Sequence, residues 1–150
     1  MTAIWTCTGS TAIVDEKSLN KYESDGAWLM HKGTSTGYLL ARCNVTNPMD
    51  KGASLGWNVL EVVYRYQRDD SKLNVVLSRI SNKGNVSRIA EFSANSLGVS
   101  PDTQMHSKFF SHSFDFANNA YFVFIEMSRK DTEDGNRPSV AIVRLQYVVT

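Results

Sequence analysis

Short runs of β-branched and aromatic residues, each closed by turn residues, follow one another from about Gly37 to Thr150. Almost no helical periodicity separates them. Side chains on a β-strand alternate between two faces, so these runs are typical of strands with one buried face. Their spacing and antiparallel-type alternation predict an all-β chain: a two-sheet antiparallel β-sandwich, jelly-roll or Greek-key-like, with about eight to ten strands.

Individual strands are predicted from period-two alternation and from the turn residues that bound them. The predicted strands cover residues 38–46, 57–68, 73–80, 86–92, 109–116, 121–129 and 139–149. Residues 93–104 carry Gly98 and Pro101 and are predicted to be the longest connection. Residues 1–36 are less regular. Short strands are expected at residues 2–5, 11–14 and 27–30, and a helical turn with Asp15 as its N-cap at residues 15–22.

The alternation also assigns faces, and therefore predicts which side chains form the core. The inward set is enriched in β-branched and aromatic residues from five predicted strands. It comprises Leu60, Val62, Leu73, Val75, Leu77, Phe114, Phe116, Val123, Ile125, Val143 and Leu145.

Length and charge narrow the functional classes. The 150 residues suit one domain, so we expect a single β-sandwich domain over residues 1–150. The net charge is +1, and no window concentrates Lys and Arg as a phosphate-binding surface would require. No apolar stretch is long enough to span a bilayer, and no signal peptide is visible. The sequence therefore predicts neither a nucleic-acid partner nor membrane insertion.

The two cysteines leave the redox state open. Cys7 and Cys43 either form a single disulfide or stay reduced, and two thiols do not decide the compartment. Cys43 alternates with Leu39, Ala41 and Val45, which favours burial of its side chain. A bond to Cys7 would tie the N-terminal segment to that strand.

No catalytic, cofactor-binding or metal site is predicted. His112, Ser113 and Asp115 suggest a hydrolase, but on a strand His112 and Ser113 would point to opposite faces and could not form a nucleophile–base pair. The three histidines lack the close spacing of zinc sites. The loop at residues 130–136 holds oxygen ligands suited to calcium but departs from the EF-hand pattern.

A carbohydrate site is the alternative with candidate residues. An aromatic ring can cover the apolar face of a pyranose while neighbouring polar groups bond its hydroxyls. Tyr38 alternates with Arg42 and Asn44 on the polar side of its strand. These three residues are therefore the possible carbohydrate contacts.

The function that the sequence favours first is a non-enzymatic structural or interaction module. Within this class we expect a subunit or decoration of a surface assembly, such as a virion, a tail or an extracellular layer, whose partners are copies of itself or neighbouring subunits. Its location would then be the virion surface or the extracellular space. A carbohydrate-binding or adhesion module that binds glycans is the alternative, and a hydrolase of unknown type comes third.

Overall fold

The computed structural model describes residues 3–49, 55–130, 132 and 137–150. Within these residues the chain forms eleven strands and three short 3₁₀ turns. The strands are β1 (Trp5–Thr8), β2 (Ile13–Val14), β3 (Tyr22–Asp25), β4 (Trp28–His31), β5 (Gly37–Val45), β6 (Val59–Tyr66), β7 (Lys72–Ser81), β8 (Val86–Ser93), β9 (Ser100–Phe109), β10 (Asn119–Arg129) and β11 (Ser139–Gln146). The turns are η1 (Gly9–Thr11), η2 (Glu16–Ser18) and η3 (Ala94–Ser96).

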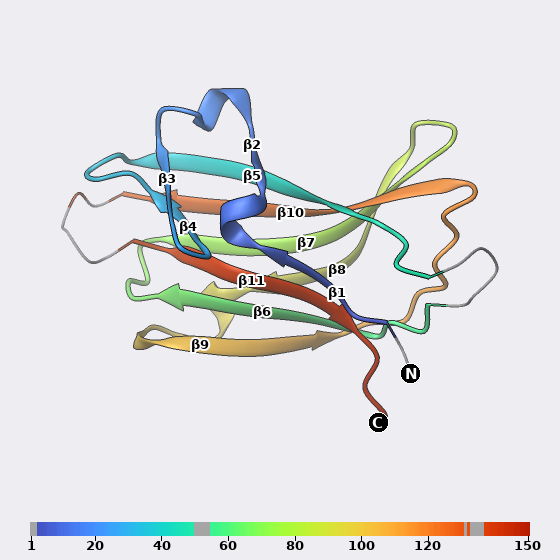
Figure 1. The fold of residues 1–150 in the computed structure, drawn as a ribbon. Helices are drawn as coiled ribbons and strands as arrows, with labels where there is room; N and C mark the ends of the chain where they lie inside the picture. The colour runs from blue at the N-terminus through green and yellow to red at the C-terminus, as the bar shows by residue number, and fades with distance from the viewer. Residues whose placement is uncertain (1–2, 50–54, 131, 133–136) are drawn as a thin grey trace.

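The strands lie in two antiparallel sheets packed against each other (Figure 1). Sheet A has the order β3-β4-β11-β6-β9, and β1 also pairs with β11. Sheet B has the order β2-β5-β10-β7-β8. The predicted all-β sandwich is confirmed. The strand number exceeds the expected eight to ten by one. The sequence predicts short strands near β1, β2 and β4, but β3 forms in addition, and its four residues are too few for an alternation to be recognised.

Most of the predicted core is confirmed. Leu60 and Val62 of β6, Leu73, Val75 and Leu77 of β7, Val123 and Ile125 of β10, and Val143 and Leu145 of β11 have no exposed surface. They pack between the two sheets, where burial of such side chains contributes about 1.5–3 kcal/mol each.

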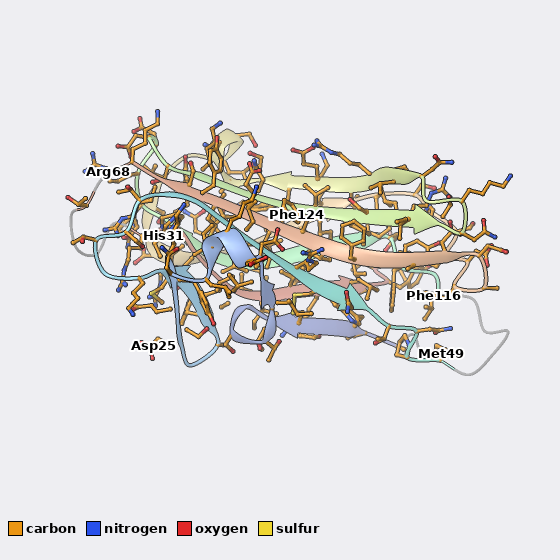
Figure 2. The ribbon with its side chains drawn as sticks, turned by 90° about the horizontal axis from the view of Figure 1, so that it is seen from above. Asp25, His31, Met49, Arg68, Phe116 and Phe124 are labelled. Atoms are coloured by element: carbon orange, nitrogen blue, oxygen red, sulfur yellow. A yellow bond between two sulfur atoms is a disulfide. The ribbon has the colours of Figure 1, made fainter. Side chains whose placement is uncertain are left out.

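Residues 93–116 differ from the prediction. The segment expected as a connection contains η3 and the first half of β9, whereas β9 ends at Phe109 and the strand expected at residues 109–116 does not form. Phe114 and Phe116 are only partly buried, in the loop that follows β9. Their alternation has another cause: the Phe114 ring packs edge-on against Trp57, with centroids 5.1 Å apart, and 4.9 Å from Tyr121. Phe116 lies at the opposite end of the sandwich from His31 (Figure 2).

Gly9 allows the N-terminal segment to dock against β11. β1 pairs with β11 at Ile142 and beyond, while β4 pairs with the same edge at Val140. Gly9 lies at the point along β11 where pairing with β1 ends and pairing with β4 begins. A Cβ built on Gly9 would stand 2.1 Å from the Val140 carbonyl oxygen. No side chain fits at that position without moving the backbone.

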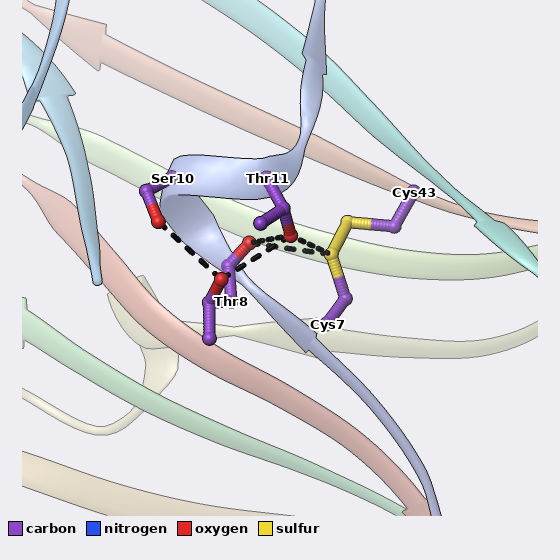
Figure 3. The surroundings of a disulfide bond; sticks show 5 residues. All are labelled: Cys7, Thr8, Ser10, Thr11 and Cys43. Carbon is purple, nitrogen blue, oxygen red and sulfur yellow. Dashed lines mark hydrogen bonds between the residues drawn. A yellow bond between two sulfur atoms is a disulfide. The ribbon is translucent and has the colours of Figure 1, made fainter. Parts of the chain in front are cut away.

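A disulfide joins the two sheets. Cys7 of β1 in sheet A is bonded to Cys43 of β5 in sheet B, across one open side of the sandwich (Figure 3). Beside it, the Thr11 hydroxyl donates a 2.9 Å hydrogen bond to the Thr8 carbonyl, closing the η1 turn. The bond thus anchors the four-residue strand β1 to the larger part of the fold. None of the helical turns in the described residues is long and apolar enough to cross a membrane.

Stability is expected to fall in acid because of His31. The His31 side chain is fully buried, and its Nε2 donates a 2.8 Å hydrogen bond to the Gly37 carbonyl. Burial lowers the pKa of His31, and the nearby charges of Arg129, Lys21 and Arg137 lower it further, against the raising effect of the Gly37 bond. The unfolded chain then binds the proton more tightly than the folded one.

The free energy of unfolding should therefore be constant above about pH 6.5 and decrease as the pH falls below that value. Burial also lowers the pKa of His112, which adds to the same trend. Urea unfolding at a series of pH values measures the slope of the free energy of unfolding against pH below about pH 6.5. The slope should decrease in His31→Gln but not in the control His106→Gln, which changes an exposed histidine. An equal slope in wild type and His31→Gln would contradict the assignment to His31.

Candidate functional site

The outward face of sheet B carries two phenylalanines on its central strand. β10 lies between β5 and β7, and its inward residues Tyr121, Val123 and Ile125 are buried. The residues between them point away from sheet A, and these are Phe122 and Phe124, both half-buried. Outward positions of an exposed antiparallel sheet are usually polar. Two large rings at adjacent outward positions are therefore the unusual feature of this face, and we call them the Phe122–Phe124 pair.

The three sequence-derived candidates lie on the same face. Tyr38, Arg42 and Asn44 occupy alternate positions of β5 and are all exposed. Asn44 lies directly opposite Phe122, and Arg42 lies opposite Phe124. Tyr38 lies opposite Ser128, further along the strand beyond Leu40. The structure therefore brings Arg42 and Asn44 to the phenylalanine pair and leaves Tyr38 at the far end of β5.

Polar side chains border the pair on its other side as well. On β7, Ser78 lies opposite Phe122 and Val76 opposite Phe124. One position further along, Asn74 Nδ2 donates a 3.3 Å hydrogen bond to Glu126 Oε1 across the β7–β10 pair. Hydroxyl, amide and carboxylate groups thus lie within one strand of the rings.

Arg42 is held in place by the N-terminal segment. Its Nη2 donates to Asp15 Oδ1 at 2.5 Å, and the Asp15 backbone N–H donates to the Leu40 carbonyl. Asp15 is the N-cap residue of η2, as expected, and its carbonyl accepts a 2.8 Å hydrogen bond from the Ser18 N–H, but its side chain makes no cap hydrogen bond. Both partners keep substantial solvent exposure, so the pair contributes little to stability and chiefly orients the guanidinium group.

A shallow hollow opens beside this face. It has a volume of about 270 Å³ and lies at the seam between β1 and β5. Its wall combines the disulfide with Trp5 and the two polar candidates Arg42 and Asn44. The hollow is close to the lower limit of small-molecule sites, roughly 300 Å³. It extends the polar border of the phenylalanine pair toward the seam.

His112, Ser113 and Asp115 do not assemble a catalytic set. His112 Nε2 lies 3.3 Å from the Tyr121 hydroxyl, and the same hydroxyl accepts a 2.8 Å hydrogen bond from the Asp115 backbone N–H. The Asp115 carboxylate accepts hydrogen bonds from Asn118 and Ala117, and the bond from the Asn118 side chain is the main cause that lowers the pKa of Asp115. The aspartate thus closes a turn instead of orienting the histidine. These residues lie in a loop, so the opposite-face argument for a strand does not apply to them.

In the part of the chain that the structure describes, no three His, Cys, Asp or Glu side chains converge as a metal site would require. Most of the loop considered for calcium, at residues 131 and 133–136, lies outside the described residues.

The Phe122–Phe124 pair was not among the sequence-derived candidates. The signal was present, because residues 121–125 are apolar without interruption, and one of the two faces had to be outward. What the sequence lacks is the register that sets Phe122 beside Asn44 and Phe124 beside Arg42.

No protein-family model matches the chain, and no curated protein sequence matches it. Among solved structures, it is similar to a xylan-binding domain from carbohydrate-binding module family 22, with a TM-score of 0.41, 11% identity and coverage of 98% of this chain and 89% of that chain. It is also similar to the C-terminal family 22 carbohydrate-binding module of Clostridium thermocellum Xyn10B, with a TM-score of 0.41, 12% identity and coverage of 98% and 88%. At such identities and TM-scores the likeness carries no inference about a ligand of this chain.

Proposed function

We propose that the protein is a non-enzymatic carbohydrate-binding module that holds a glycan on the outward face of sheet B. The observation that supports this function is the solvent-facing Phe122–Phe124 pair, placed between the polar side chains of β5 and β7. Flat apolar surfaces next to hydrogen-bonding groups match the two-sided chemistry of a sugar ring, which has C–H faces and hydroxyl edges.

The dimensions of the face favour a chain of sugars over a single sugar. Phe122 and Phe124 are two residues apart on one strand, so their side chains emerge about 7 Å apart. Tyr38 and Asn44 mark the ends of a stripe of roughly 20 Å along β5. In this arrangement the two rings stack on neighbouring sugar units, and Arg42 and Asn44 donate hydrogen bonds to their hydroxyls.

The proposal gives no residue a catalytic role. The Asp115 carboxylate is occupied by the turn at Asn118, and the His112 ring lies against Tyr121. Membership of a surface assembly, and with it a virion or extracellular location, stays a prediction. We place carbohydrate binding first because it accounts for the two outward phenylalanines and for the polar groups around them.

Replacing one ring tests the proposal. In Phe124→Ala the affinity for an oligosaccharide found on a glycan array should decrease at least about tenfold, since buried aromatic contacts are common determinants of affinity. Isothermal titration calorimetry measures the change. The matched control is Phe109→Ala, which removes an exposed phenylalanine from sheet A. Affinity that is unchanged in Phe124→Ala, or reduced equally in both variants, would place the binding site elsewhere.

A further inference from the structure

Strand β9 is an open edge of sheet A. It is ten residues long, pairs only with β6 among the described strands, and has eight exposed residues. A free edge presents unpaired N–H and C=O groups that can accept another strand. Natural edges are commonly protected by proline, by charge or by a bulge. In β9, Pro101 and Asp102 coincide with a register shift in the pairing with β6 at the start of the strand, and Lys108 is the one full charge near its end.

The segment Gln104–Phe109 keeps a regular register with β6. The Phe110 N–H donates to the Asn58 carbonyl at 2.9 Å, in the same register. Hydrogen-bonded pairs alternate in an antiparallel ladder, so Gln104, His106 and Lys108 direct their backbone groups to β6. Met105 and Ser107 then direct theirs away from the sheet. These outward groups are the ones that an added strand would bond.

Exposed apolar side chains gather at this edge. Met105 and Phe109 are 61% and 55% exposed, and both belong to the outer face of sheet A, opposite Val63 and Val59 respectively. Leu97 and Val99, just before β9, are also largely exposed. A strand edge flanked by apolar side chains buries more surface on pairing than a polar edge does, and therefore gains more from it.

The charges of β9 are self-complementary about Met105. In an antiparallel pair of two β9 strands related by a two-fold axis at Met105, Asp102 faces Lys108 of the other copy, and Thr103 faces Ser107. Among the described residues neither Asp102 nor Lys108 forms an ion pair within its own chain. In this register two Asp102–Lys108 ion pairs form between the copies, one at each end of the contact. No Asp, Glu, Lys or Arg lies between Asp102 and Lys108 in the sequence.

We propose that two copies of the chain associate through β9, antiparallel about Met105, so that the two sheets A become one continuous sheet. The two Met105 side chains pack against each other on the axis, Phe109 of each copy covers Pro101 of the other, and Asp102–Lys108 pairs close both ends. The outward face of sheet B takes no part, so this association is independent of carbohydrate binding.

Charge reversal tests the register. Sedimentation velocity from about 10 µM to about 1 mM, the range suited to a small interface, should show a monomer–dimer equilibrium for the wild type. Asp102→Lys and Lys108→Asp should each weaken it at least about tenfold, because like charges then face each other. The double variant exchanges the two charges and should regain the wild-type constant. A strict monomer throughout this range, or association insensitive to both reversals, would overturn the proposal.

A single cysteine tests the axis itself. Cys7 and Cys43 are bonded to each other, so an introduced cysteine is the only free thiol in the described residues. In Met105→Cys the two Cα atoms would lie about 5.5 Å apart, within the range of a disulfide. Ser107→Cys is the control, since the Cα atoms of residue 107 in the two copies would lie roughly 14 Å apart. A covalent dimer should form in Met105→Cys alone, and equal cross-linking of both variants would contradict the register.

Discussion

Val123→Asp is expected to leave the protein unfolded. Val123 has no exposed surface and lies in the centre of sheet B, opposite Cys43 on one side and Leu77 on the other. No basic side chain belongs to the buried cluster around it. Burial of an unpaired carboxylate costs several kcal/mol, which is comparable to the whole net stability of a domain, about 5–15 kcal/mol. Circular dichroism and the solubility of the expressed variant measure the result.

The adjacent residue supplies the control. Phe124→Asp introduces the same carboxylate on the same strand but on the solvent-facing side, so this variant should fold. A Val123→Asp protein that melts at the wild-type temperature would show that Val123 does not lie between the sheets.

Loss of the disulfide is expected to have the second largest effect. Cys7 and Cys43 are 36 residues apart, and closing a loop of that length in the unfolded chain corresponds to about 4 kcal/mol. For a chain of this size the melting temperature should decrease by roughly 10 °C. We expect the decrease in Cys7→Ser/Cys43→Ser and, equally, in the wild type after reduction. The bond also retains β1, whose four residues pair only with β11 among the described strands.

Thermal unfolding with and without a reducing agent measures this effect. The double serine variant is the control, because a reducing agent should leave its melting temperature unchanged. A wild-type melting temperature that does not respond to complete reduction would contradict the stabilising role of the bond between the sheets.

How far the fold follows from the sequence depends on how much of each strand is buried. β6 alternates Leu60, Val62, Tyr64 and Tyr66 because one of its faces packs against sheet B, and this pattern is visible without a structure. β9 is an edge strand exposed on most of its length, so no apolar period marks it. Residues 110–116 alternate aromatic and polar side chains and therefore predict a strand. In the structure these aromatic residues pack in a loop at one end of the sandwich.

Apart from the Cys7–Cys43 bond, which the sequence left as one of two alternatives, contacts between distant segments could not be predicted. The need for Gly9 arises from the Val140 carbonyl, which is more than a hundred residues away and reaches it only when β1 and β4 share one edge of β11. The exposure of Tyr38, Arg42 and Asn44 on one strand could be anticipated from alternation. Their relation to Phe122 and Phe124 could not, because a shift of one residue in the β5–β10 register would place other side chains beside the rings.

Nuclear magnetic resonance titration with the best oligosaccharide from the glycan array tests the central claim most directly. Chemical shifts should change most at the Phe122 and Phe124 rings and at the amides of Arg42 and Asn44, with little change on sheet A. Changes concentrated on sheet A, where the Arg65 guanidinium lies 4.2 Å from the centroid of the Trp28 ring, would contradict the account, as would the failure of every glycan on the array to bind.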